Sequence, residues 1–262
     1  MDFASESEVA DPLLRMRLPA VLRVLRRPAR EFLRAATDLL LPDVCPACGA
    51  HATGLCRPCD QALVRRPGMG CRRCGEPVLG VGEACGSEHR DLQNLVQLVA
   101  PWRFVGTGGA LVRHFKLDGD AGAGRWIGRA MSNAFRSQVG QAWRKAVVVP
   151  VPLHAARRRQ RGFDQAAWLA EELGRRLGLR VAVDTMARTR ATLPQGDPRV
   201  TSRERNVEGA FVVRRGGVAA VAGRQVVLVD DVFTSGATAR QCAAVLRAAG
   251  ARHVLMLTAC RS

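Results

Sequence analysis

Two adjacent aspartates and the hydroxyl-bearing residues after them form the stretch of this chain best suited to chemistry. Residues 226–238 read VVLVDDVFTSGAT, so that Asp230 and Asp231 follow an apolar run and precede a loop of small residues. At a helix N-terminus such a loop offers unpaired N–H groups, hydroxyls and the positive end of the helix dipole, which together suit a phosphate. The carboxylates suit sugar hydroxyls, directly or through a divalent cation. The loop residues are Thr234, Ser235, Gly236, Ala237 and Thr238.

This pattern resembles the ribose-phosphate signature of type I phosphoribosyltransferases, which bind phosphoribosyl pyrophosphate (PRPP). A buried strand with an Asp-rich turn and a helix cap would explain part of the pattern but not its full order. Other phosphate motifs are absent from the sequence, since no G-x-x-x-x-G-K-[ST] occurs and Gly122-Ala-Gly124 lacks the spacing of a dinucleotide loop. The resemblance implies catalytic roles for Asp230 and Asp231, a phosphate cradle at Thr234–Thr238, and Mg²⁺ bound with PRPP.

A second segment could supply positive charge to phosphate groups. Residues 147–153 read VVVPVPL, a buried strand running into a turn, and four arginines follow between positions 157 and 161. The strand should end at the same sheet edge as the aspartates, so we expect a pyrophosphate-binding loop there. Arg161 is its expected phosphate ligand, with Lys116 and Arg203 as helpers. Residues 188–211 hold few apolar anchors and predict either a mobile loop that closes over the ligand or an ordinary exposed connection.

Seven of the nine cysteines lie between Cys45 and Cys85. Six of them form three C-x-x-C units, and thiolates that flank tight turns at this spacing suit tetrahedral zinc. Disulfides are not expected in a cytoplasmic chain. We expect one structural zinc site from the first two units. Its ligands would be Cys45, Cys48, Cys56 and Cys59.

A second zinc site is less regular. Cys71 and Cys74 are followed by Cys85 alone, and His89 is the candidate fourth ligand because imidazole readily replaces thiolate at zinc. The alternative for His89 is an ordinary surface histidine. The spacing also permits an interleaved pairing, in which the first and third C-x-x-C units share one ion. In either pairing the sites would be closed and structural.

Alternating strands and helices from residue 95 onward must position these groups. The expected strands are 95–100, 146–151, 181–183, 211–213, 226–229 and 254–258, and the expected helices are 109–115, 125–138, 165–177 and 239–249. This alternation predicts a parallel sheet with its ligand at the carboxyl ends of the strands. The predicted fold class is α/β, a type I phosphoribosyltransferase-like parallel sheet flanked by helices, with a small N-terminal zinc-ribbon module.

Length and charge narrow the possible functions. The 262 residues can hold one medium domain and a small one, and no apolar run approaches the ~20 residues needed to span a bilayer. The acidic N-terminus is unlike a signal peptide, so we expect a cytoplasmic protein. A net charge of +17 favours a nucleic-acid or nucleotide partner over a merely solvated basic surface. Cys242 and Cys260 lie within apolar patterns and are expected core thiols.

Three regions follow from these patterns. Residues 1–42 are an N-terminal extension, 43–90 the zinc-ribbon module and 95–262 the phosphoribosyltransferase-like domain. Within the extension, residues 13–41 form a basic amphipathic segment. Such a segment could lie at the inner face of the membrane, on a partner, or on the protein's own surface.

The order of motifs over residues 39–262 resembles the ComF family (ComFC- and GntX-like proteins). The matching motifs are LLLP-x-x-C at Leu39–Cys45, the cysteine knuckles, His114-Phe-Lys116, the segment Val149–Gln165, R-x-R-A-T…Q at Arg188–Gln195, R-x-x-N from Arg203, and VLVDDVFTSGAT. The chain departs from the family pattern in three places. Asp164 stands in RGFDQ where the family has RGFNQ, the last C-x-x-C is broken at Cys85, and residues 1–38 are added.

The resemblance implies a phosphoribosyltransferase fold with a zinc ribbon and a role in uptake of transforming single-stranded DNA. Its implied partners are PRPP, single-stranded nucleic acid and a helicase or DNA-transport protein, for which the ribbon could be the docking platform. Two functions stay open. The protein could transfer the phosphoribosyl group to an acceptor, or it could be an inactive adaptor that senses PRPP or binds single-stranded DNA.

Overall fold

The computed structural model describes residues 44–66, 71, 74, 92–190, 202, 205 and 207–262, without the side chains of residues 160 and 161. The chain divides into two units, Met1–Asp43 and Val44–Ser262, and all described residues belong to the second. The predicted N-terminal extension with its amphipathic segment lies outside the described residues. Within the described ranges, no helix is both long and apolar enough to cross a membrane.

The second unit is an α/β structure. Its helices are α2 (Arg57–Gln61), α3 (Gly106–Arg113), α4 (Ala121–Gln138), α5 (Ala155–Arg161), α6 (Gln165–Leu177), α8 (Arg215–Val221) and α9 (Ala237–Ala248), with a π turn at His114–Asp118 and a 3-10 turn at Gly140–Trp143. Its strands are β1 (Gln97–Val99), β2 (Trp102–Arg103), β3 (Val147–Pro150), β4 (Arg180–Val181), β5 (Met186–Arg188), β6 (Phe211–Val213), β7 (Gln225–Phe233) and β8 (His253–Arg261).

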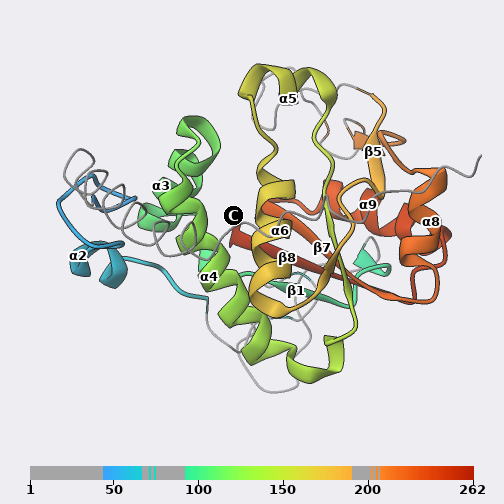
Figure 1. Cartoon of the computed structure of the whole chain (residues 1–262), viewed down its shortest axis with the longest axis horizontal. Coiled ribbons are helices and arrows are strands. Elements are labelled where there is room, and N and C mark those ends of the chain that lie inside the picture. Colours follow the sequence, from blue (N-terminus) through green and yellow to red (C-terminus); the bar gives the residue numbers. More distant parts are fainter. Residues whose placement is uncertain are drawn as a thin grey trace, which may run out of the picture. The chain divides into compact units, whose positions relative to one another are not determined.

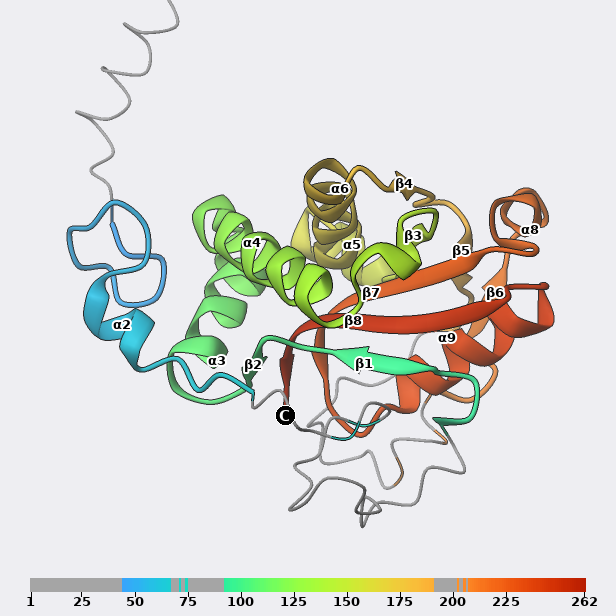
Figure 2. The ribbon, with the colours of Figure 1, turned by 90° about the horizontal axis from the view of Figure 1, so that it is seen from below.

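The main sheet is parallel, with strand order β1-β8-β7-β3-β4 and with β2 also paired to β8. Its two longest strands, β7 and β8, run side by side through its centre (Figure 2). Residues Val226–Val229 of β7 are fully buried. A parallel strand covered by helices on both faces needs apolar side chains in both directions, which explains this unbroken apolar run.

Helices cover both faces of the sheet. α4 and α6 lie side by side (Figure 1) on one face, and α9 lies on the other (Figure 2). Side chains of β7 alternate between two cores: Val227 and Val229 pack in the core beneath α4 and α6, whereas Val226 and Leu228 pack in the core beside α9. The predicted fold class, a parallel sheet flanked by helices with a small N-terminal cysteine-rich ribbon, is confirmed.

Three local expectations were wrong. The strand at 211–213 is not in the main sheet, because β6 pairs antiparallel with β5 in a separate two-stranded sheet. The arginine run forms helix α5 rather than a loop. Strand β7 does not end at Val229 but continues to Phe233, because β8 pairs with it as far as Arg261. The two aspartates therefore lie within the strand.

The first part of the ribbon packs against this α/β structure. Leu63 is buried in the core that also holds residues of α3 and α4. The Arg103 N–H donates to the Val64 carbonyl at 2.9 Å, and Arg65 forms an antiparallel bridge with Trp102 of β2. The residues after the second C-x-x-C unit thus join the ribbon to the edge of the sheet.

Candidate functional site

A pocket lies where the winding of the sheet reverses. After β3 the chain crosses through α6 to β4, whereas after β7 it crosses through α9 to β8 on the other side. Because α6 and α9 cover opposite faces, a crevice is expected at the carboxyl ends of β3 and β7. A cavity of about 230 Å³ lies there. Its polar and loop lining includes Lys116, Arg157, Asp164, Gln165, Arg188, Asp230, Asp231, Thr234, Gly236 and Thr238.

The predicted phosphate loop forms one part of this lining. Gly236 caps α9 with a φ of +80°, and a Cβ on it would lie 2.7 Å from the Phe233 ring, so both backbone and space require glycine. Thr234 and Thr238 line the cavity beside it. The Ser235 hydroxyl instead accepts the Ala237 N–H at 3.4 Å, and Ala237 is buried. The loop therefore presents a helix N-terminus with two threonines to the cavity.

The two aspartates face opposite sides of β7. By the alternation of the strand, Asp231 follows Val227 and Val229 toward the α4 and α6 side, whereas Asp230 points toward α9. Asp231 Oδ2 lies 2.8 Å from Lys116 Nζ. Burial and the neighbouring Asp231 carboxylate raise the pKa of Asp230 to about 7, although Lys116 and Arg188 oppose this shift. The two carboxylates thus differ in their electrostatic surroundings.

Arginines from α5 and β5 bring positive charge to the pocket. Arg157 and Arg188 both line it, and the Arg188 guanidinium stacks over the Phe211 ring with 5.2 Å to the centroid. Burial lowers the pKa of Arg188, and the positive charges of Arg157 and Arg190 lower it further. The two guanidinium groups that line the cavity form an environment that favours an anion.

These arginines differ in part from those expected. The Arg161 side chain and Arg203 lie outside the described residues, so their predicted roles stay predictions. Arg157 and Arg188 had been noticed only as members of an arginine run and of the R-x-R-A-T motif. Nothing in the spacing showed that they line the same cavity as the aspartates, and Arg188 lies on β5, which pairs with β6 outside the main sheet.

The RGFDQ motif begins α6. Asp164 caps this helix, accepting the Ala167 N–H on Oδ1 at 3.0 Å, and its Oδ2 lies 3.9 Å from Arg158 Nε. Asparagine and aspartate are equally good N-caps, so Asp164 keeps the capping role in spite of the departure from RGFNQ. The added negative charge lies at the cavity wall, since Asp164 lines it.

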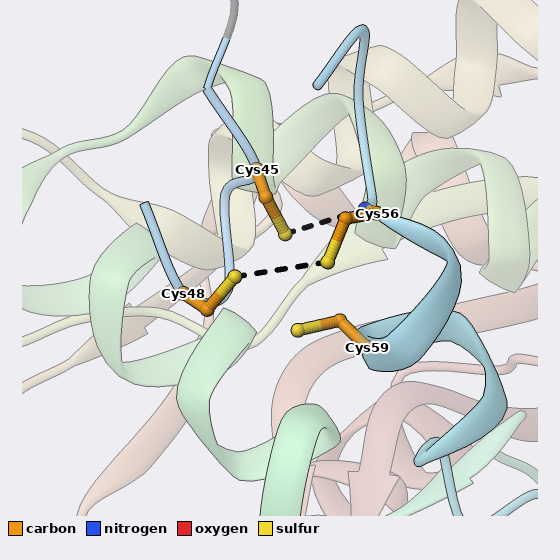
Figure 3. Close-up of side chains that lie close together, drawn as sticks. All are labelled: Cys45, Cys48, Cys56 and Cys59. Carbon is orange, nitrogen blue, oxygen red and sulfur yellow. Dashed lines mark hydrogen bonds between the residues drawn. The ribbon is translucent and has the colours of Figure 1, made fainter. Parts of the chain in front are cut away.

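Four cysteines of the ribbon converge on one point (Figure 3). The sulfurs of Cys45, Cys48, Cys56 and Cys59 all lie within 4.8 Å of one another. Cys48 Sγ and Cys56 Sγ are 3.7 Å apart, and the Cys56 N–H donates to Cys45 Sγ at 3.4 Å. The first two C-x-x-C units therefore pair, as predicted, and the interleaved pairing is not the one formed.

The electrostatics of this cluster fit a bound cation. Burial raises the pKa of Cys45, but backbone N–H groups of Cys56, Ala47 and Cys48 outweigh it and lower the pKa to about 6. Burial and the neighbouring thiols raise the pKa of Cys59 to about 12. Four thiolates cannot gather without a compensating charge, which a zinc ion supplies in a closed four-thiolate site.

The second predicted zinc site is described only in part. Cys74 is buried in the core beside α9, Cys71 packs against that core, and Arg261 Nε donates to the Cys74 carbonyl at 3.0 Å. Cys85 and His89 lie outside the described residues. A second zinc ion therefore stays a prediction.

Comparisons with known proteins agree with these features. Residues 36–87 match the double zinc ribbon domain family. The DNA utilization protein YhgH of Escherichia coli K12 is 29% identical over 241 residues, covering 86% of this chain and 99% of that protein. Competence protein F of Haemophilus influenzae is 26% identical over 208 residues, covering 77% and 87%. This chain is a homologue of these proteins.

A further homologue is competence protein ComFC of Bacillus subtilis, 28% identical over 198 residues, covering 70% of this chain and 74% of that protein. The resemblance to ComF proteins drawn from the motifs is thereby confirmed.

Two solved structures are similar to part of this homologue of the ComF proteins. A glutamine PRPP amidotransferase from Bacillus subtilis, complexed with ADP and GMP, is 24% identical with a TM-score of 0.34; the match covers 51% of this chain and 25% of that one. A hypoxanthine phosphoribosyltransferase from Staphylococcus aureus is 12% identical with a TM-score of 0.33, covering 51% and 62%. With TM-scores this low, the fold assignment rests on strand order and the covered faces of the sheet.

Proposed function

We propose that this protein binds PRPP with Mg²⁺ in the pocket between β3 and β7 and acts on or beside DNA in the cytoplasm. One observation carries the proposal: the pocket joins a threonine-lined helix N-terminus, two carboxylates and cations from three other elements. PRPP has a 5-phosphate, a ribose diol and a pyrophosphate, which match these three kinds of group. The names of the homologues, which refer to competence and DNA utilization, support the link to DNA.

Each part of PRPP then has its own binding groups. Thr234–Thr238 would hold the 5-phosphate, and Asp230 and Asp231 would orient the ribose, directly or through water bound to Mg²⁺. Arg157 and Arg188, with Arg161 and Arg203 as the motifs imply, would surround the pyrophosphate. Carboxylate and phosphate oxygens are the ligands that Mg²⁺ prefers, and the ion would neutralise charge on the pyrophosphate.

A transferase reaction would use the same groups. A nucleophile would attack C1 of the ribose while the bond from C1 to the pyrophosphate oxygen breaks, and the pyrophosphate would leave with the bonding electron pair. Positive charge that develops on the sugar would be stabilised by the nearby carboxylates. The arginines would stabilise the departing pyrophosphate, and the loop would hold the ribose in place for the attack.

The experiment is calorimetric titration of PRPP with Mg²⁺ into zinc-loaded wild type and into the Asp230→Asn/Asp231→Asn variant. We expect binding by the wild type and its loss in the variant. No binding by folded wild type would contradict the proposal. Pyrophosphate release on adding single-stranded DNA would make the protein a phosphoribosyltransferase.

A second candidate is an adaptor that binds single-stranded DNA and PRPP without turnover. The net charge of +17 favours this candidate, because a basic surface can follow a nucleic-acid backbone. PRPP that binds but is not consumed in the presence of DNA would distinguish it from the transferase. A helicase or transport protein that docks on the ribbon would fit either candidate.

A further inference from the structure

Lys116 lines the cavity, but the charged group it contacts there is a carboxylate. It was expected to help bind pyrophosphate, yet its Nζ lies 2.8 Å from Asp231 Oδ2. The Asp231 side chain is 9% exposed and that of Lys116 is 33% exposed, so the pair is largely shielded from water. Breaking this pair would leave a shielded carboxylate without its countercharge, which is unfavourable, so Lys116 is held at Asp231.

The backbone of Lys116 is anchored from the α6 side. Phe115 is buried and packs edge-on against Phe163 at 5.7 Å between centroids, and its ring lies 5.2 Å from that of Trp168. The buried Gln165 side chain donates from Nε2 to the Lys116 carbonyl at 3.3 Å. These contacts join the HFK and RGFDQ motifs and hold the π turn that carries Lys116.

The π turn itself supports a specific role. π turns are rare in proteins and are frequently found at functional sites. Here the turn His114–Asp118 follows α3 and ends at Gly119, whose φ is +68°. The turn carries Lys116, whose Nζ lies 2.8 Å from Asp231 Oδ2 on the α4 and α6 side of β7.

We propose that Lys116 is a positioning residue that holds the Asp231 side chain toward the ribose of the ligand, and is not itself a ligand of the pyrophosphate. This inference rests on the proposed binding of PRPP. Gln165 belongs to the same arrangement, since it fixes the carbonyl of Lys116. Asp230, on the opposite face of β7, is held by a different contact, since its Oδ1 accepts the Asp231 N–H at 2.9 Å.

Two ligands distinguish a Lys116 that positions Asp231 from a Lys116 that contacts the pyrophosphate. Ribose 5-phosphate lacks the pyrophosphate but keeps the ribose and the 5-phosphate. If Lys116 acts through Asp231, the Lys116→Met variant binds ribose 5-phosphate and PRPP more weakly than wild type by the same factor. We expect this loss of affinity to be about tenfold, as for a coupled pair in contact. If Lys116 binds pyrophosphate, only the affinity for PRPP falls in this variant, and the inference is overturned.

A double-mutant cycle gives an independent readout. Calorimetry with PRPP and Mg²⁺ on wild type, Lys116→Met, Asp231→Asn and the double variant should show that the double variant loses no more affinity than the weaker-binding single variant. If the affinity losses of the two single variants multiply in the double variant, the inference is overturned. Lys116→Arg, which keeps the charge, should restore part of the affinity.

The matched control for Lys116→Met is a substitution at a lysine away from the cavity. Lys145→Met makes the same change at the chain's other lysine, which is exposed, and should leave both affinities unchanged. Near-UV circular dichroism of each variant verifies that it is folded. If zinc-loaded wild type binds neither ligand, the proposed function fails and this inference with it. If wild type binds PRPP and the losses multiply, only the inference fails.

Discussion

At the residue scale, the raised pKa of Asp230 makes the stability of the ligand-free protein depend on pH. Its pKa is about 7 in the folded protein against a model-peptide value of 3.8, so the folded state holds a proton that the unfolded state has lost over this interval. A raised acid pKa contributes stability below the unfolded pKa, and that contribution is lost as pH rises through the folded pKa. Stability from this group therefore falls between about pH 4 and pH 7.

We predict that Asp230→Asn removes this fall of folding stability with rising pH. Urea unfolding at pH 5 and pH 8 should show a stability advantage of the variant over wild type that is larger at pH 8, because the amide stays neutral where the half-buried carboxyl group beside Asp231 becomes charged. Asp184→Asn, at an exposed carboxylate, is the matched control. A stability advantage that is the same at both pH values would contradict the raised pKa of Asp230.

Gly236 shows how one residue shapes the phosphate loop. We predict that Gly236→Ala destabilises the protein by roughly 1–3 kcal/mol, because it adds both a left-handed non-glycine residue and a clash with Phe233. Gly178→Ala is the control, since φ there is +67° with nothing within 4 Å of the added Cβ. Chemical denaturation should show a smaller loss at Gly178, and equal losses would mean that the Phe233 clash is absent.

At the scale of elements, the ribbon and the sheet should unfold together. Leu63 lies in the shared core, the Val64 carbonyl accepts the Arg103 N–H, and a Cβ on Gly54 would lie 2.7 Å from Trp126 Nε1 of α4. The cysteine cluster therefore lies at the end of a continuous packed structure. Loss of its metal should affect more than the ribbon.

We predict that Cys56→Ser, or removal of zinc by a chelator, lowers the melting temperature of the whole second unit by roughly 5–10 °C in one transition, because metal binding contributes folding free energy. Far-UV circular dichroism and tryptophan fluorescence should report the same midpoint. His51→Ala, at an exposed ribbon residue, should leave it unchanged. An unshifted main transition would show that ribbon and sheet fold independently.

Local signals explain which elements were predictable. α6 has the predicted bounds because Asp164 caps its start and Gly178, at φ +67°, ends it. α5 was not predicted because its cap is unusual: His154 Nδ1 accepts the Ala156 N–H at 3.3 Å, and histidine is not a typical N-cap. The position of β6 outside the main sheet depends on its pairing with β5, which no local pattern encodes.

At the scale of the whole molecule, the charge predicts how DNA binding responds to salt. With a net charge of +17, we predict that affinity for single-stranded DNA falls steeply and linearly on a log–log plot against salt, because bound cations of the strand are released. Fluorescence anisotropy with a labelled oligonucleotide measures this. The Asp230→Asn/Asp231→Asn variant should keep the slope, and a slope near zero would exclude a backbone-tracking surface.

The sequence by itself determined the turn of small and hydroxyl residues before α9, the cysteines available to a metal and the parallel α/β class. Each depends on residues close in the chain: a glycine at positive φ before a helix, thiols two residues apart, and strands alternating with helices. Only the tertiary structure decided which cation meets which carboxylate. Lys116 reaches Asp231 while Arg188 lies on the side of Asp230 because neighbouring residues of β7 face opposite cores, and the helices and the hairpin that cover those cores come from distant parts of the chain.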